Sequence, residues 1–173
     1  MNIPNILTIL RIILVPVFAY LMHLNFYMPA AILFIAAVLT DFLDGFLARK
    51  FNQVTNFGKV MDPVADKLLV LTALFMLTFQ KKISMEIFII VVAKEVLIGI
   101  GGILLYRNKK RISGADWYGK IASGIFYFAI VMLILDVKYS ETFIIIAVAA
   151  TVFALAKYAA KYIKMTHESS GKP

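Results

Sequence analysis

The 173-residue sequence contains no cysteine and few charged residues, and both shortages narrow the kind of protein it encodes. Without cysteine the chain forms no disulfide, offers no thiolate metal ligand and has no cysteine nucleophile. Charged residues make up 16% of the chain, whereas a soluble domain usually has about 25%. Only five prolines and nine glycines are present, and no serine- or glutamine-rich tract, which argues against disorder. The composition therefore indicates an ordered protein that is not an ordinary soluble domain.

Hydrophobic residues are abundant instead, at 62% of the sequence, and the mean hydropathy is +0.88. The net charge is +8, from 18 lysines and arginines against 10 acidic residues. A basic chain can bind nucleic acid, but the apolar excess favours an anionic membrane surface as its partner. We therefore expect an integral membrane protein that contacts membrane lipids and no nucleic acid.

Six segments are long and apolar enough to cross a bilayer as helices, which requires about 20 residues each. The expected fold is all-α: a polytopic membrane protein with six transmembrane helices in one bundle, forming a single domain over residues 1–173. The six predicted spans cover residues 6–24, 27–48, 62–80, 83–106, 117–135 and 141–162.

Basic residues between the spans predict how the bundle is oriented, because cytoplasmic segments carry an excess of lysine and arginine. With six crossings and both termini in the cytoplasm, 11 basic residues fall inside and 3 outside, whereas five or seven crossings would spoil this bias. The inner set is Arg49, Lys50, Lys59, Arg107, Lys109, Lys110, Arg111, Lys157, Lys161, Lys164 and Lys172, and the outer set is Lys81, Lys82 and Lys138.

Acidic side chains within spans are costly and usually functional, and half of the ten in this chain lie there: Asp41, Asp44, Asp62, Asp66 and Glu95. The second span ends and the third begins at the cytoplasmic face, so the four aspartates are expected in one shallow layer. Asp41 and Asp44 are three residues apart, and Asp62 and Asp66 are four apart. Each pair is therefore expected on one face of its helix.

Four carboxylates in a poorly hydrated layer repel one another, and divalent cations resolve that conflict. Oxygen ligands without histidine or cysteine favour Mg²⁺ or Mn²⁺ over zinc. Two such ions about 4 Å apart would clamp a diphosphate. Gly45 leaves room for a ligand near the backbone, Arg49 pairs with phosphate oxygens, and Gly58 is expected to form a turn beside the pocket.

Other readings of the aspartates stay open at this point. Asp62 precedes Pro63 at the predicted start of a span, where it would serve only as a helix cap. Carboxylates within spans also serve cation or proton transporters, so transport is the main alternative function. A membrane scaffold without activity is a third.

The spacing of these residues also resembles a known family signature. The chain reads Asp41, Asp44, Gly45, Ala48 and Arg49, followed after eight residues by Gly58, then Asp62 and Asp66 at intervals of four. These eight residues over 26 positions match the CDP-alcohol phosphotransferase signature, and the chain is similar to that family over most of its length. Residues 3–11 (IPNILTILR) and 40–70 resemble the phosphatidylglycerophosphate synthase branch.

The resemblance implies a bacterial inner-membrane enzyme, active at the cytoplasmic face and homodimeric. It would transfer the phosphatidyl group of CDP-diacylglycerol to sn-glycerol 3-phosphate and release CMP. It also implies that Asp41, Asp44, Asp62 and Asp66 bind two Mg²⁺ or Mn²⁺ ions, with Asp66 as general base. The CDP-lipid would contact Asn5, Thr8, Asp44, Gly45, Arg49, Thr55 and Gly58.

The acceptor is predicted from the remaining basic residues, and Lys67, Lys94, Arg107 and Lys120 are the candidates for its phosphate. Lys94 is expected to pair with an aspartate or to meet a ligand phosphate. Glu95 is expected to face a different helix, because adjacent residues of a helix point apart. The branch typically has Arg-Glu at Lys94-Glu95 and a further arginine near Gly101-Gly102. Phosphatidylglycerol, inositol phosphate and serine are therefore alternative acceptors.

Overall fold

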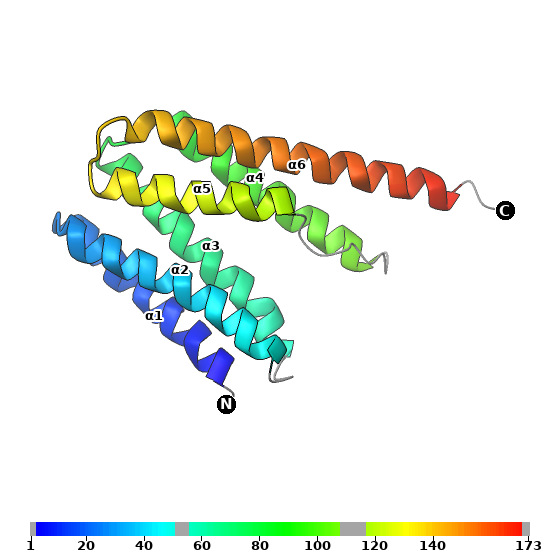
Figure 1. Cartoon of the computed structure of the whole chain (residues 1–173), viewed down its shortest axis with the longest axis horizontal. Coiled ribbons are helices and arrows are strands. Elements are labelled where there is room, and N and C mark those ends of the chain that lie inside the picture. The colour runs from blue at the N-terminus through cyan, green and yellow to red at the C-terminus, as the bar shows by residue number, and fades with distance from the viewer. Residues whose placement is uncertain (1–2, 51–55, 108–116, 171–173) are drawn as a thin grey trace. The chain divides into compact units, whose positions relative to one another are not determined.

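A computed structural model describes residues 3–50, 56–107 and 117–170, and over these residues it contains six helices and no strand (Figure 1). Within these ranges, side chains are described except at 3, 4, 44–50, 56, 57, 59, 60, 99–107, 117, 118, 158, 159 and 161–170. The all-α prediction with six helices is confirmed. The helices are α1 (Ile3–His23), α2 (Tyr27–Lys50), α3 (Asn56–Phe79), α4 (Met85–Arg107), α5 (Trp117–Ile134) and α6 (Ser140–Ser170).

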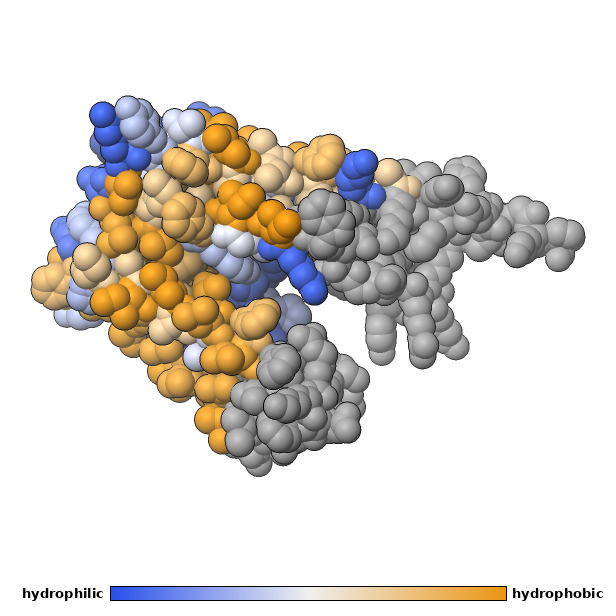
Figure 2. Space-filling model, viewed as in Figure 1, coloured by the Kyte–Doolittle hydropathy of each residue, from blue (hydrophilic) through white to orange (hydrophobic). Residues whose placement is uncertain are grey.

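Two of the helices are long and apolar enough to span a membrane, over Asn5–His23 and Ser140–Lys157. Tyr27–Leu43 and Gly119–Ile134 are shorter apolar stretches. Large apolar side chains are exposed along several helices, for example Phe42 at 72%, and apolar residues cover much of the coloured surface in Figure 2. Such exposure suits a lipid environment better than water. Six crossings with cytoplasmic termini stay a prediction.

The chain folds as two compact units, which are described separately. The first comprises Met1–Ser84 and Ile130–Lys138, and the second Met85–Ala129 and Tyr139–Pro173. In the first unit α1 packs along both α2 and α3, whereas α2 and α3 contact each other much less. Phe18 of α1 and Phe34 of α2 are fully buried, with ring centroids 5.9 Å apart. Helix α1 is thus the central element that joins its two neighbours.

The second unit packs α4 against α6, and its core contains Val91 of α4, Phe126 of α5 and Ile144 of α6. The rings of Phe128 and Phe143 meet edge to face, 6.4 Å between centroids, a favoured arrangement for aromatic pairs. These contacts position the charged residues of α4 described below.

Helix α3 begins at Asn56 and not at residue 62, which corrects two predictions. Gly58 is helical and buried, so it does not form the expected turn. Asp62 lies about 9 Å along the helix at 1.5 Å per residue, too far in to cap it, and Pro63 lies inside the helix. The first part of α3, residues 56–61, was not predicted from hydropathy, because it includes a glycine and a lysine and does not extend the apolar run.

Three turns of the first unit end their helices in the same way, each with a non-glycine residue at positive φ: Asn25 (60°), Lys81 (59°) and Asp136 (56°). In the first of them the Asn25 amide donates to the Met22 carbonyl at 3.1 Å, and the next amide donates to the Leu21 carbonyl at 2.9 Å. This is the Schellman pattern of helix C-termini. The turns after α3 and α5 repeat both hydrogen bonds.

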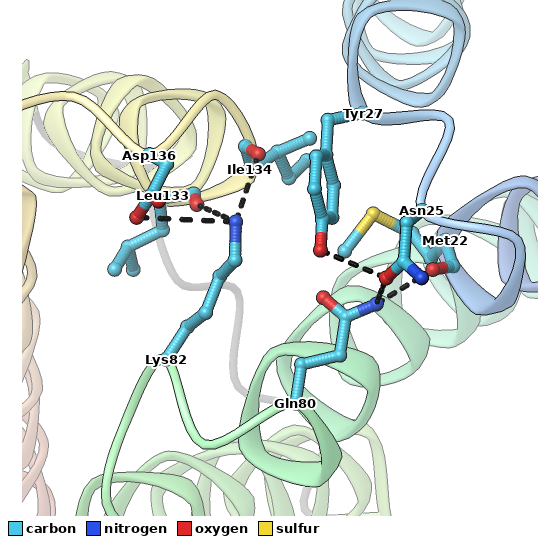
Figure 3. A network of polar contacts seen from close by, with 8 residues as sticks. All are labelled: Met22, Asn25, Tyr27, Gln80, Lys82, Leu133, Ile134 and Asp136. Atoms are coloured by element: carbon cyan, nitrogen blue, oxygen red, sulfur yellow. Dashed lines mark hydrogen bonds and ion pairs between the residues drawn. The ribbon is translucent and has the colours of Figure 1, made fainter.

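Lys82 connects two of these turns (Figure 3). Its Nζ lies 3.4 Å from the Leu133 carbonyl oxygen and 3.3 Å from that of Ile134, at the C-terminus of α5. The same atom is 4.0 Å from Asp136 Oδ1 and 3.8 Å from the centroid of the Tyr27 ring. Burial lowers the pKa of Lys82, and the Asp136 carboxylate opposes that shift. A cation here complements the helix dipole of α5.

Gln80 and Asn25 extend the same network between the α1 and α3 ends (Figure 3). The Gln80 amide donates to the Met22 carbonyl at 2.6 Å and to Asn25 Oδ1 at 3.4 Å. The Tyr27 hydroxyl donates to Asn25 Oδ1 at 2.8 Å. The network therefore fixes the end of the first unit that lies opposite the four aspartates of the signature.

Candidate active site

The four signature aspartates lie in the C-terminal half of α2 and the N-terminal half of α3, and their expected gathering in one layer stays a prediction. Asp41 and Asp44 belong to α2, and Asp62 and Asp66 belong to α3. The Asp41, Asp62 and Asp66 side chains are partly exposed, and that of Asp44 lies outside the described side chains. All four residues belong to the first unit.

Arg11 of α1 is paired with the first signature aspartate. Its Nη1 lies 2.6 Å from Asp41 Oδ1, and the Arg11 side chain is 1% exposed against 37% for Asp41. A guanidinium buried without a charged partner is strongly destabilising, and the partly exposed Asp41 provides that partner. Sequence reasoning gave Arg11 no role in the site. The available signal was a charge within the first apolar span.

Thr8 of α1 donates a short hydrogen bond from its hydroxyl to Asp62 Oδ1. The Thr8 side chain is fully buried. Thr8 and Arg11 are three residues apart and share one face of α1, so this face bonds one aspartate on each of the two signature helices. Thr8 was predicted to bind the CDP-lipid; the structure shows its hydroxyl bonded to a carboxylate.

Asp66 lies beside Lys67, with 3.8 Å between Lys67 Nζ and Asp66 Oδ2. The Lys67 side chain is 42% exposed and that of Asp66 is 16% exposed. The predicted general base and one predicted acceptor ligand are therefore neighbours in space, and the lysine side chain is partly exposed.

The donor atoms of the signature aspartates determine which metal ion the site fits. Among the described side chains, no group of three or more His, Cys, Asp or Glu residues lies close enough to hold an ion. Asp44 is not among those side chains. The three described donors are partly exposed carboxylates without histidine or cysteine, and two are anchored from α1. This donor chemistry fits a hard divalent cation such as Mg²⁺ or Mn²⁺.

In the second unit the structure pairs Lys94 with its neighbour. Lys94 is 8% exposed, and its Nζ lies 2.7 Å from Glu95 Oε1 and 5.3 Å from the centroid of the Phe126 ring. The expectation that Lys94 and Glu95 face apart is wrong, and the partner that the structure shows for Lys94 is Glu95. Both side chains are long enough to bend together, and an unpaired charge in apolar surroundings costs more than the bend.

The other predicted ligands divide between the units. Asn5 is partly exposed on α1. Gly45 and Arg49 lie in the part of α2, residues 44–50, whose side chains are not described. Thr55 lies outside the described residues, as does the side chain of Arg107. Lys120 is exposed on α5 in the second unit. Their assignment to the CDP-lipid or the acceptor stays a prediction.

The helical fold and the aspartate signature agree with comparison to known sequences. Residues 1–153 match the CDP-alcohol phosphatidyltransferase family, and the chain belongs to that family. Members of the family are membrane enzymes and generally depend on a divalent metal.

Relatives named CDP-diacylglycerol–glycerol-3-phosphate 3-phosphatidyltransferase are similar to this chain. The one from Aquifex aeolicus is 39% identical over 111 residues, which is 63% of this chain and 62% of the relative. The one from Rickettsia typhi is 37% identical over 143 residues, 80% of this chain and 79% of the relative. The one from Pseudomonas fluorescens is 51% identical over 80 residues, 44% of this chain and 41% of the relative.

Proposed function

We propose that this chain transfers the phosphatidyl group of CDP-diacylglycerol to sn-glycerol 3-phosphate, giving phosphatidylglycerophosphate and CMP. The observation that carries the proposal is the complete aspartate signature, with Asp41, Asp62 and Asp66 on neighbouring helices of one unit. The names of the relatives support the same reaction.

In this proposal each aspartate has a defined task. Asp41, Asp44, Asp62 and Asp66 hold two Mg²⁺ or Mn²⁺ ions, whose chemistry is to share the charge that develops on the diphosphate. Asp66 takes the proton from the acceptor hydroxyl, which is a poor nucleophile until that proton has a base. The hydroxyl oxygen bonds to the lipid phosphorus as the diphosphate P–O bond breaks. CMP leaves with the bonding electrons, and no covalent enzyme intermediate is formed.

Lys67 is the residue best supported as a ligand of the acceptor phosphate, because its ammonium lies beside Asp66 and is open to solvent. A phosphate bound there brings the hydroxyl of the same molecule toward the base. Lys94, Arg107 and Lys120 are further candidates from the sequence. For Lys94 this role requires that the pair with Glu95 opens.

Lys67→Met is expected to raise the KM for glycerol 3-phosphate about tenfold or more, because a hydrogen bond to a charged group contributes about 1.5–3 kcal/mol. The KM for CDP-diacylglycerol should change little. The measurement is initial rate of CMP release against each substrate. Lys81→Met is the matched control, since Lys81 is an exposed lysine in the turn after α3. An unchanged acceptor KM would withdraw Lys67 from the acceptor site.

The proposal also includes the membrane location and the oligomeric state of the enzyme. The excess of basic residues in the predicted inner segments supports an active site at the cytoplasmic face of a bacterial inner membrane. A homodimer is proposed from the resemblance to the family.

A panel of acceptors tests the function directly. Purified protein in detergent is given CDP-diacylglycerol with glycerol 3-phosphate, phosphatidylglycerol, inositol phosphate or serine, and CMP and the lipid product are identified by mass. We expect release of CMP with glycerol 3-phosphate and formation of phosphatidylglycerophosphate. Release with phosphatidylglycerol alone would instead assign cardiolipin synthesis. No CMP with any acceptor would favour a transporter or a scaffold.

A further inference from the structure

Over the described residues, the two helices that carry the halves of the aspartate signature contact each other much less than each contacts α1. Helix α2 carries Asp41 and Asp44, and α3 carries Asp62 and Asp66. Both helices pack instead along α1, which joins them over most of the first unit. The contacts of α1 therefore help to set the relative position of Asp41 and Asp62.

Helix α1 contacts both halves through two buried polar residues on one face. Arg11 forms an ion pair with Asp41 on α2, and the Thr8 hydroxyl donates a hydrogen bond to Asp62 on α3. Thr8 is 0% exposed and Arg11 is 1% exposed, in a helix that is otherwise strongly apolar. Buried polar groups in such a helix are expensive, and each is bonded to a signature carboxylate.

We propose that Thr8 and Arg11 are positioning residues, which hold Asp62 and Asp41 in register so that the carboxylates of α2 and α3 bind divalent cations together. This inference rests on the proposed function, because it assigns the carboxylates to cations. Each α1 residue bonds the Oδ1 atom of its aspartate.

The chemistry of the two side chains suits this task. Threonine is branched at Cβ and has few χ1 rotamers, so a buried Thr8 hydroxyl has little freedom to leave Asp62. The planar guanidinium of Arg11 fixes the direction of a carboxylate in a way that an ammonium does not. Residues that orient metal ligands typically change metal affinity 10–100-fold when replaced.

The charge of Arg11 and its orientation of Asp41 have opposite effects on cation affinity, and the variants are chosen to separate the two. Removing a positive charge beside Asp41 would strengthen attraction for a cation, whereas losing the orientation would weaken binding. Arg11→Lys keeps the charge and changes the geometry. Thr8→Val keeps the shape and charge and removes only the hydrogen bond. These two variants therefore report position alone.

The test is Mn²⁺ affinity, measured by electron paramagnetic resonance on purified full-length protein in detergent without substrate. Thr8→Val and Arg11→Lys are each expected to bind Mn²⁺ about tenfold more weakly or worse, while Thr8→Ser, which restores a hydroxyl, stays within about threefold of wild type. Melting temperature without metal is measured in parallel. Thr78→Val is the matched control, because the Thr78 hydroxyl donates to Leu74 of its own helix, about 24 Å along α3 from Asp62.

The outcomes separate this inference from the function on which it rests. Equal Mn²⁺ affinity in wild type, Thr8→Val and Arg11→Lys would overturn the positioning role and leave the proposed function standing. A weaker affinity that only follows a lower metal-free melting temperature, and is shared by Thr8→Ser, would overturn it as well. Wild-type protein that binds no Mn²⁺ would overturn the metal chemistry of the proposed function itself.

Discussion

Asp66→Asn is expected to lower the rate of CMP release by about 10²–10⁴, the usual contribution of a general base. Asparagine has nearly the same shape as aspartate, but its amide does not take a proton at neutral pH. The acceptor hydroxyl would then reach the lipid phosphorus without a base. CDP-diacylglycerol binding should persist, because Asp41, Asp44 and Asp62 are unchanged in this variant. The measurements are kcat from CMP release and CDP-diacylglycerol affinity by calorimetry.

Asp136→Asn is the matched control for this change. The Asp136 side chain is 81% exposed and lies beside Lys82 in the turn after α5, at the opposite end of the first unit. It should keep near wild-type turnover. Near-normal activity in Asp66→Asn would remove Asp66 as the base. A loss of Mn²⁺ affinity that accounts for the whole fall in rate would make Asp66 a metal ligand only.

The sequence predicted the helices well because long apolar runs mark them directly. The predicted starts of α2 and α5 agree with the structure. The start of α3 was wrong because a helix can extend beyond the apolar run that signals it, here into residues 56–61. Chain order and helix length alone were enough to place the aspartates in the C-terminal half of α2 and the N-terminal half of α3.

Partners of polar side chains were harder to predict, because they depend on which helix faces which. Arg11 stood out as a charge in an apolar span, but its pairing with Asp41 follows from the packing of α1 on α2. Lys94 and Glu95 were expected to diverge, since helix geometry places their Cβ atoms apart. The flexible ends of both side chains meet at 2.7 Å, which residue spacing does not reveal.

The polar contacts at the two ends of the first unit have different kinds of partner. At one end Asn25, Lys81 and Asp136 close three helices with positive φ values, and side chains bond carbonyl groups that the helices leave open. At the other end the bonds from α1 go to carboxylates that remain partly exposed. The first set of bonds closes helix ends, whereas the second contacts carboxylates that we propose as metal ligands.

Removal of divalent metal is expected to lower CMP release at least about 100-fold, because a bound cation contributes several kcal/mol to stabilising the charge that develops in the reaction. Mg²⁺ or Mn²⁺ should restore the rate after removal of the chelator. Ca²⁺ should restore it poorly, since it prefers longer bonds and more ligands. The carboxylate-only donor set is the reason for this order.

The measurement is CMP release in excess EDTA, with the metal content of the protein checked by mass spectrometry. Melting temperature in EDTA is the control, because the turn network around Lys82 uses no carboxylate of the signature and should keep the first unit folded. Full activity in protein shown to be free of metal would contradict the assignment of Asp41, Asp44, Asp62 and Asp66 as metal ligands. Loss of activity that Mg²⁺ reverses, without loss of folding, is the expected result, because the proposed cations stabilise the charge that develops on the diphosphate.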